Sequence, residues 1–275
     1  MREVGKGMKV RFLGTAAFEG IPSMFCRCEL CLKAKELGGK DIRTRTSAMI
    51  DDELKIDFPP DTYLHMLRDG LDLEKIQDLV LTHSHSDHLY AEDLFARFPG
   101  YARSGEHTIG IYGNDLTMRK CRQVLGDGNN KYSLHRVVPF RRTQTRTASI
   151  VPLPANHDPL ETCLIYYIEK DGKTLLYGHD SGWFPEETWE WLSDKKLDLA
   201  VLECTAGRLD TRTHMNIDST VRTKERFVER GMLNPSGQVV VTHFSHNAHL
   251  LHQDLAEIFA PHEIIVAYDG MVLEI

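Results

Sequence analysis

Short apolar runs recur along the chain of 275 residues and are separated by polar segments that contain Gly, Pro, Asp or Asn. Runs of this kind, bounded by turn-forming residues, are typical of buried β-strands. The pattern predicts strands at residues 9–13, 47–50, 54–56, 78–82, 108–112, 134–138, 148–153, 163–169, 174–178, 198–203, 238–242 and 263–267.

Apolar positions with helical spacing occupy several of the intervals between these strands. They predict helices near residues 61–69, 90–98, 186–194, 218–230 and 249–259. Many strands with interspersed helices indicate a layered α/β or α+β fold. No repeat, low-complexity tract or linker divides the chain, so we expect a single domain over residues 1–275. Residues 1–7 are interpreted as an N-terminal extension, with Met8 as an alternative start.

Composition excludes several classes of protein. The chain is 41% hydrophobic and 27% charged, which is ordinary for a globular protein. No apolar run approaches the roughly 20 residues that span a bilayer, and the first residues lack the apolar stretch of a signal peptide. We therefore expect a cytoplasmic protein with no membrane partner. The formal charge of -7 argues against nucleic acid as the main partner.

Histidine is unusually frequent, with 14 residues, and the strongest cluster lies in Thr82-His83-Ser84-His85-Ser86-Asp87-His88. In extended chain, His83 and His85 project to the same side with Cα atoms roughly 6.6 Å apart, so both imidazoles reach one ion. Asp87 and His88 are adjacent and point apart unless the chain turns, so they more naturally serve a second ion. A polar loop with scattered histidines is the alternative interpretation.

The H-x-H-x-D-H spacing of His83, His85, Asp87 and His88 resembles the metallo-β-lactamase superfamily. Three further blocks match that superfamily in order, each following a predicted strand: His157, Asp180 and His243. The resemblance extends over nearly the whole chain. It implies an α/β fold, a four-layer αββα sandwich of the metallo-β-lactamase type.

Carried over residue by residue, the resemblance implies two metal sites that share one carboxylate. One ion would bind three histidines and the other an Asp and two histidines, with a bridging Asp between them: His83, His85 and His157; Asp87, His88 and His243; and Asp180. His179 is the alternative to Asp180, but the two oxygens of a carboxylate make it the better bridge. His and carboxylate ligands suit Mn, Zn or Fe. The remaining histidines are interpreted as structural or surface residues: His65, His107, His135, His249, His252 and His262.

A second cluster, Cys26-Arg27-Cys28-Glu29-Leu30-Cys31, places three thiols within six residues. Thiolates favour zinc, and a closed zinc site needs a fourth ligand. Free thiols or a disulfide in a surface loop remain the alternatives. The other three cysteines are expected to be core residues: Cys121, Cys163 and Cys204.

The C-x-C-x-x-C spacing, combined with the late Thr242-His243-Phe244-Ser245-His246, resembles the carbon–phosphorus lyase accessory phosphodiesterase (PhnP-like) family. The resemblance implies that His246 closes a structural zinc site with Cys26, Cys28 and Cys31. Such a zinc would tie the zinc-binding loop, residues 26–31, to the loop that carries His243. The PqqB family carries a similar cysteine motif but lacks the full catalytic set, which is present here.

The resemblance implies a phosphodiesterase with two divalent ions, acting on small or cyclic ribose phosphodiesters. Two ions can bridge and deprotonate a water, and the hydroxide would attack phosphorus. Asp87 would orient this nucleophile or accept its proton, and His214 would protonate the leaving group or contact the phosphate. A surface role is the alternative for His214. Contact of Arg208 and Arg212 with substrate is left open.

Three other classes of protein would also use the first metal site. Ribonuclease Z-like enzymes usually carry a protruding arm for tRNA, and no Gly/Pro/Lys-rich insertion matches it here. The cysteine triplet and the block from Thr242 to His246 disfavour a thioester, lactone or β-lactam hydrolase. A metal-binding biosynthetic accessory protein of the PqqB type is the non-enzymatic alternative. The expected partner is a small anionic phosphodiester, and a homodimer is compatible with the sequence.

Overall fold

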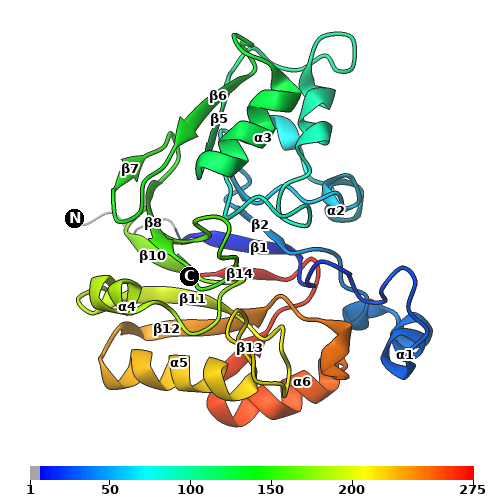
Figure 1. Cartoon of the computed structure of the whole chain (residues 1–275), viewed down its shortest axis with the longest axis vertical. Helices are drawn as coiled ribbons and strands as arrows, with labels where there is room; N and C mark the ends of the chain where they lie inside the picture. The colour runs from blue at the N-terminus through cyan, green and yellow to red at the C-terminus, as the bar shows by residue number, and fades with distance from the viewer. Residues whose placement is uncertain (1–6) are drawn as a thin grey trace.

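The computed structural model describes residues 7–275 and consists of two stacked sheets with helices on both outer faces (Figure 1). This arrangement confirms the predicted α/β fold with four αββα layers. The predicted N-terminal extension, residues 1–7, lies outside the described residues except for Gly7.

The first sheet has seven strands in the order β14-β1-β2-β3-β4-β5-β6. Pairing is antiparallel from β14 to β3 and parallel from β3 to β6. The strands are β1 (Lys9–Gly14), β2 (Ser47–Ile50), β3 (Leu54–Ile56), β4 (Asp78–Val80), β5 (Ile109–Gly113), β6 (Tyr132–Arg136) and β14 (Val272–Glu274).

The second sheet also has seven strands, in the order β13-β12-β11-β10-β9-β8-β7. Pairing is antiparallel from β7 to β10 and parallel from β10 to β13. The strands are β7 (Thr143–Gln144), β8 (Ser149–Pro154), β9 (Leu164–Lys170), β10 (Lys173–Tyr177), β11 (Leu197–Glu203), β12 (Leu233–Thr242) and β13 (Ile264–Val266).

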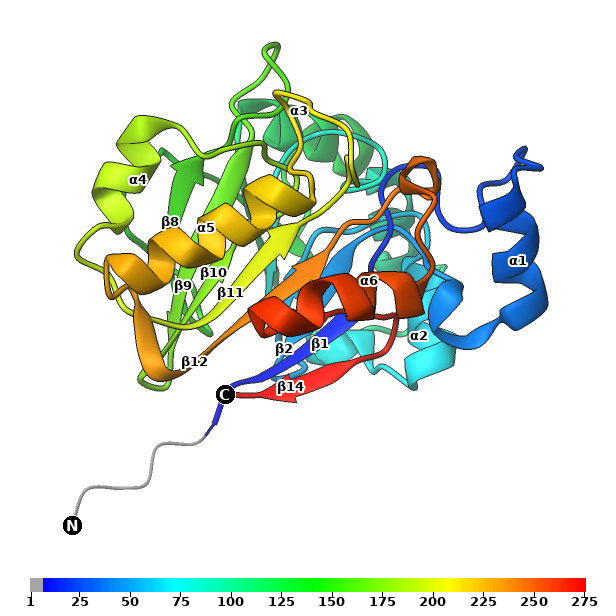
Figure 2. The ribbon, with the colours of Figure 1, turned by 90° about the horizontal axis from the view of Figure 1, so that it is seen from below.

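Helices cover the outer face of each sheet. On the first sheet lie α2 (Thr62–Asp69), α3 (Asp115–Leu125) and the 3₁₀ helix η3 (Ala91–Arg97). On the second lie α4 (Glu186–Leu192), α5 (Ile217–Glu229) and α6 (His252–Phe259) (Figure 2). Helix α1 (Glu29–Leu37) follows the cysteine triplet, and short 3₁₀ helices occupy Gly39–Asp41, Leu73–Lys75, His246–Ala248 and Ala260–His262.

Three apolar cores separate the four layers. Alternation along the strands sends successive side chains to opposite faces. In β10, Leu175 and Tyr177 enter the core between the sheets, whereas Leu176 enters the core beneath α4, α5 and α6. The third core lies between the first sheet and the helices on its outer face. Both sheets are therefore covered on both faces, as parallel strands require.

The strands predicted from the sequence are confirmed within a few residues, except that β12 begins at Leu233 rather than at residue 238, whereas several helical predictions change. Residues 91–97 form a 3₁₀ helix rather than an α-helix. The helix predicted at 249–259 begins only at His252, because His249 has a left-handed φ of 55°. Helices α1 and α3 and strands β7 and β14 were not predicted. Among the described residues, no helix is both long and apolar enough to span a bilayer.

Truncation of Leu199 to Ala should strongly destabilise the fold, because this side chain is fully buried between the sheets. The loss of buried methyl groups and the resulting cavity should lower the free energy of unfolding by about 2 to 5 kcal/mol. Urea denaturation followed by circular dichroism measures the change. Leu67→Ala is the matched control, since Leu67 is 61% exposed, and it should change stability by less than about 0.5 kcal/mol. Equal losses in both variants would contradict the proposed location of the core.

Candidate metal centre and active site

The predicted ligands lie on loops at the ends of strands from both sheets. The segment from His83 to His88 follows β4, His157 follows β8, Asp180 follows β10 and His243 follows β12. Asp180 and His243 both have a left-handed φ of 56°, which is uncommon outside glycine. Such strained residues concentrate at functional sites. The strand ends therefore turn sharply where the candidate ligands begin.

The first group of ligands contains His83, His85, His157 and Asp180, whose potential ligand atoms all lie within 4.8 Å of one another. Nε2 of His157 lies 3.3 Å from Nδ1 of His85. Nε2 of His83 lies 3.2 Å from Oδ2 of Asp180. The structure therefore brings together the three histidines and the carboxylate that the sequence assigned to one ion.

The second group contains Asp87, His88 and His243, again with potential ligand atoms within 4.8 Å. Nε2 of His88 lies 3.1 Å from Oδ2 of Asp87 and 3.4 Å from Nε2 of His243. This set matches the residues assigned to the second ion. The adjacent side chains of Asp87 and His88 converge because residues 86–88 lie in a turn after β4.

Asp180 joins the two groups. Its Oδ2 atom is 3.2 Å from Nε2 of His83 in the first group and 3.0 Å from Nε2 of His88 in the second. Burial opposes ionisation, yet the surrounding histidines, His243 foremost, hold the pKa of Asp180 well below its usual range. Asp180 is therefore an anionic carboxylate in the position of a bridge.

The donor set fits divalent cations. Nε2 of His83 and Oδ1 of Asp180 are buried and make no hydrogen bond of acceptable geometry among the described residues, although Asp180 and His214 respectively lie 3.2 Å from them. Buried polar atoms are almost always partnered, so these two indicate a ligand. Imidazole nitrogens and carboxylate oxygens are the donors that Zn, Mn and Fe accept. The site therefore has the chemistry of a metal centre.

Residues behind the ligands fix the orientation of their imidazole rings. Nδ1 of His88 lies 2.7 Å from Oδ2 of Asp57, and Nε2 of His85 lies 3.0 Å from Oδ2 of Asp158. Nδ1 of His243 lies 2.8 Å from Oγ1 of Thr205. Each contact leaves the opposite ring nitrogen facing the other ligands. Such partners typically set the tautomer of metal-binding histidines.

Sequence reasoning did not identify Asp57, Asp158 and Thr205. The available signals were weak, since Asp57 merely follows a predicted strand and Asp158 merely follows His157. Asp57 also accepts hydrogen bonds from the backbone N–H and the hydroxyl of Thr82. The carboxylate of Asp57 thus connects the end of β3 to the ligand-bearing loop after β4.

His179 lies behind the metal centre. Its Nε2 atom is 3.4 Å from Oδ2 of Asp57 and 3.4 Å from Nδ1 of His88, the nitrogen that faces away from Asp87 and Asp180. His179 is therefore placed against the supporting carboxylate, whereas its neighbour Asp180 lies between the two ligand groups. This geometry favours the choice of Asp180 over His179 as the bridging residue.

His214 borders the metal centre from the loop that leads into α5. Its Nδ1 atom is 3.1 Å from Oε1 of Glu203 and 3.2 Å from Oδ1 of Asp180. Asn216 caps α5 by accepting a hydrogen bond from the N–H of Ser219, so the helix start fixes the end of this loop. Burial alone lowers the pKa of His214, but the Glu203 carboxylate raises it to about 9. His214 can therefore carry a proton at neutral pH.

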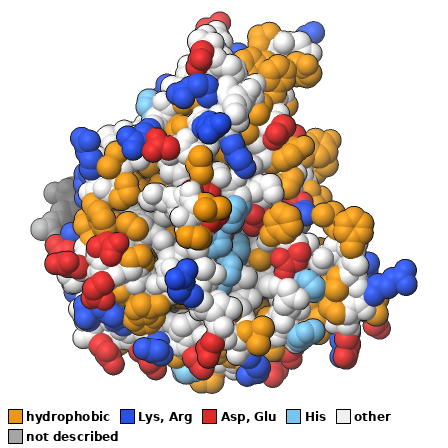
Figure 3. All heavy atoms as spheres, viewed as in Figure 1, with side chains coloured by type: hydrophobic (Ala, Val, Ile, Leu, Met, Phe, Trp, Pro, Cys, Tyr) orange, Lys and Arg blue, Asp and Glu red, His pale blue; other side chains and the backbone are white. Residues whose placement is uncertain are grey.

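The ligand groups open into a cleft of about 510 Å³. Figure 3 shows histidine side chains gathered near the centre of the molecular face that contains them. Several residues outside the ligand set also line this cleft: Ala17, Phe18, Glu19, Ser86, Thr205, His214, Ser245 and Asn247. Arg208 and Arg212 are not among the lining residues, and Arg208 instead borders a separate surface pocket with His249.

The cysteine cluster is also assembled. The potential ligand atoms of Cys26, Cys28, Cys31 and His246 lie within 4.8 Å of one another, and both Cys26 Sγ and Cys28 Sγ are 3.6 Å from Nδ1 of His246. Burial opposes ionisation of Cys28, but hydrogen bonds from His246 and the N–H of Cys31 lower its pKa to about 6. Three thiols and one imidazole form a complete four-ligand set for zinc.

All six cysteines are free thiols, so the disulfide alternative for the triplet is wrong. Cys121, Cys163 and Cys204 are buried, in agreement with their predicted core position. His246 lies three residues after His243, so one loop contributes to both ligand sets. The thiol cluster therefore joins the start of α1 to the loop of the metal centre.

Three solved structures share this fold over nearly their whole length. A diphosphatase from the PhnP family is 26% identical, with a TM-score of 0.78 and coverage of 98% of both chains. Zinc-bound PqqB from Methylobacterium extorquens is 18% identical, with a TM-score of 0.77, and covers 97% of this chain and 100% of its own. The short form of human tRNase Z, ELAC1, is 16% identical, with a TM-score of 0.65, and covers 96% of this chain and 98% of its own.

A search of curated proteins gave no significant match. The sequence model for the beta-lactamase superfamily domain matches residues 58–244, which is more than half of the chain. The matched region contains all seven residues of the two candidate ligand groups. The chain therefore belongs to the beta-lactamase superfamily, with the metallo-β-lactamase fold and the clustered metal ligands of its hydrolases.

Proposed function

We propose that this protein is a phosphodiesterase that uses two divalent metal ions to hydrolyse small or cyclic ribose phosphodiesters. The observation that carries the proposal is the position of Asp180 between two ligand groups, with His214 beside it. Two adjacent cations and a nearby proton donor suit displacement at phosphorus. Similarity to a PhnP-family diphosphatase supports a phosphate substrate.

In this proposal, His83, His85 and His157 would hold one ion, and Asp87, His88 and His243 would hold the other, with Asp180 shared between the two groups. Mn, Zn or Fe would serve at this centre, whereas the three thiols and His246 would hold a structural Zn. When bound, the two ions would supply Lewis acidity toward the phosphate oxygens and a nucleophile generated from water.

Two side chains, Asp87 and His214, would transfer protons during the reaction at phosphorus. Asp87 borders the cleft. Burial alone raises the pKa of Asp87, but the charge of His88 outweighs burial and holds this pKa well below its usual range. Ionised Asp87 can orient the attacking water or accept its proton. His214, kept protonated by Glu203, donates a proton to the departing alkoxide. A sugar alkoxide needs such a donor, since it is a poor leaving group near neutral pH.

The cleft suits a compact substrate. Its volume of about 510 Å³ lies within the usual range for small-molecule sites. The exposed ring of Phe18 offers a face for a base or sugar at the rim. The net charge of -7 disfavours a long nucleic acid as substrate. A small anion is favoured instead, because the metal ions alone would attract it. Because none of the six cysteines forms a disulfide, we also propose a reducing, cytoplasmic location.

Metal content tests the ligand assignment. The purified protein should contain about three divalent ions per chain by elemental analysis, two at the catalytic groups and one zinc at the thiols. Asp180→Asn should retain the zinc, lose catalytic metal and reduce hydrolysis of bis(p-nitrophenyl) phosphate by about 100-fold or more. His246→Ala should instead lose the zinc and keep the catalytic ions.

The control is His249→Asn, because His249 is an exposed residue on the same loop and asparagine tolerates its left-handed φ. This variant should keep all three ions. Loss of a catalytic ion in His246→Ala, with zinc still on the thiols, would show that the roles of His243 and His246 are assigned wrongly.

The leaving group tests the role of His214. p-Nitrophenolate departs without a proton, whereas the ribose alkoxide of a 2′,3′-cyclic nucleotide requires one. His214→Asn should therefore lower kcat on the cyclic nucleotide by about 100- to 10,000-fold, and by less than about tenfold on bis(p-nitrophenyl) phosphate. Steady-state kinetics with Mn and with Zn measure both rates.

His135→Asn serves as the matched control, since His135 is exposed on β6 and should leave both rates unchanged. Equal losses on the two substrates would assign His214 to phosphate or metal placement instead of proton donation. Full activity of His214→Asn on both substrates would exclude His214 from the reaction.

A further inference from the structure

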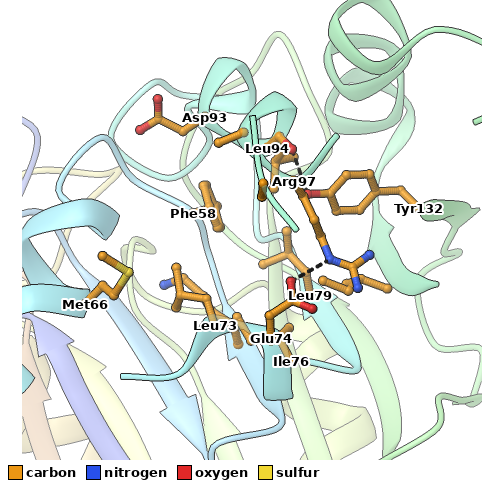
Figure 4. Close-up of a pocket in the computed structure, with 14 residues that line it drawn as sticks. Phe58, Met66, Leu73, Glu74, Ile76, Leu79, Asp93, Leu94, Arg97 and Tyr132 are labelled. Carbon is orange, nitrogen blue, oxygen red and sulfur yellow. Dashed lines mark hydrogen bonds and ion pairs between the residues drawn. The ribbon is translucent and has the colours of Figure 1, made fainter. Parts of the chain in front are cut away.

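A second cavity lies on the outer side of the first sheet and shares no residue with the metal ligands (Figure 4). Its volume is about 260 Å³. Most of its wall is apolar, formed by Phe58, Met66, Leu73, Leu79, Leu94 and Ile109. An engineered apolar cavity of about 150 Å³ binds benzene, so this cavity has room for a longer apolar molecule.

The lysine of β3 lies in the wall of this apolar cavity. Leu54 and Ile56 point into the core between the sheets, so the intervening Lys55 projects to the outer face. The Lys55 side chain is completely buried. Nζ of Lys55 donates a hydrogen bond to Oγ of Ser47 at 2.5 Å. An ammonium has three N–H donors, so two of them have no protein acceptor among residues 7–275.

Lys55 also lacks an ion-pair partner in the described part of the chain. The negative charge of Asp57 raises the pKa of Lys55. The side-chain oxygens of Asp57, however, form their hydrogen bonds with Thr82 and His88. The buried His65 nearby supplies no negative charge. Burial lowers the pKa of Lys55 to about 7, as expected for an amine without a close counter-ion.

The other charged residues of the wall are either paired or placed at its exposed edge. Arg97 contacts Glu74 at 3.2 Å and donates to the carbonyl of Lys131. Glu74 also accepts the N–H of Gly105. Asp93 is exposed, and Figure 4 shows its carboxylate directed away from Leu79 and Ile76. Lys55 is thus the buried charged group of the wall that has no charged partner among residues 7–275; its Nζ atom has the hydroxyl of Ser47 and, 5.6 Å away, the ring of Phe58 as neighbours.

We propose that this cavity binds a small amphipathic monoanion, with its carboxylate on Lys55 and its aliphatic body against the apolar wall. A buried ammonium with unsatisfied donors is costly, and an anionic head would supply both the missing charge and the missing acceptors. An aliphatic tail would cover the apolar wall at the same time. A straight-chain fatty acid of the size of octanoate has both features.

Isothermal titration calorimetry of the full-length, metal-loaded protein with three probes tests the proposal. Octanoate, 1-octanol and octylammonium share the same chain and differ in the charge of the head group. Octanoate should bind with one site per chain and about ten- to a hundredfold more tightly than octanol. Octylammonium should bind more weakly than octanol. Equal affinities of the three probes, or no octanoate binding at millimolar concentration, would overturn the proposal.

Two variants locate the site. Lys55→Met keeps a similar volume without the charge, so octanoate affinity should fall to that of octanol while octanol binding persists. Ala102→Trp blocks the cavity from an exposed lining residue and should abolish binding of both probes. Lys35→Met, at an exposed position of α1, is the matched charge control. Octanoate binding that survives Ala102→Trp would place the ligand elsewhere, even if Lys55→Met failed to fold. None of these measurements depends on phosphodiesterase activity.

Discussion

The contact on which the active site depends is that between the buried carboxylate of Asp180 and the imidazoles around it. Asp180 lies within 3.4 Å of four histidines from three separate loops: His83 and His88 after β4, His157 after β8 and His214 before α5. An ionised carboxylate in a buried site requires positive charge nearby. Divalent ions would provide that charge, and His83, His88 and His157 are placed to hold them. The loops of both sheets therefore converge on a centre whose donor set suits cations.

The αββα layers explain why these loops meet. Parallel pairing of β3 with β4, of β10 with β11 and of β11 with β12 places several carboxyl ends of strands together. The apolar cores hold the strands in register, while left-handed φ values at Asp57, Asp180 and His243 turn the chain at the strand ends. The strain at these residues is offset by the packing of the strands that precede them. The cores thus determine the position of the site although they contain none of its ligands.

The sequence was sufficient for the fold and for naming the residues that the structure brings together in the two candidate ligand groups, because each belongs to a recognisable block after an apolar strand. The supporting residues could not be predicted in this way. Asp57 orients His88 only because β3 pairs in parallel with β4, and a single sequence does not specify that pairing. Glu203 contacts His214 across a loop, which no local pattern encodes. Helices α1 and α3 were missed because each buries only a short face that contains a cysteine: Leu30, Cys31 and Ala34 in α1, and Thr117, Met118, Cys121 and Leu125 in α3.

The loop from His243 to His246 connects the reaction centre to the thiol cluster. At the first residue of this loop, the hydroxyl of Thr205 donates a hydrogen bond to the carbonyl oxygen of His243 and lies 2.8 Å from its Nδ1 atom. At the last residue of the loop, Nδ1 of His246 faces the sulfur atoms of Cys26 and Cys28. Between them, the hydroxyl of Ser245 donates to Glu19, which lines the cleft. A loop fixed at both ends has few alternative conformations, so His243 keeps its orientation despite its strained backbone. Zinc at the thiols would therefore stabilise the catalytic geometry from outside the reaction centre.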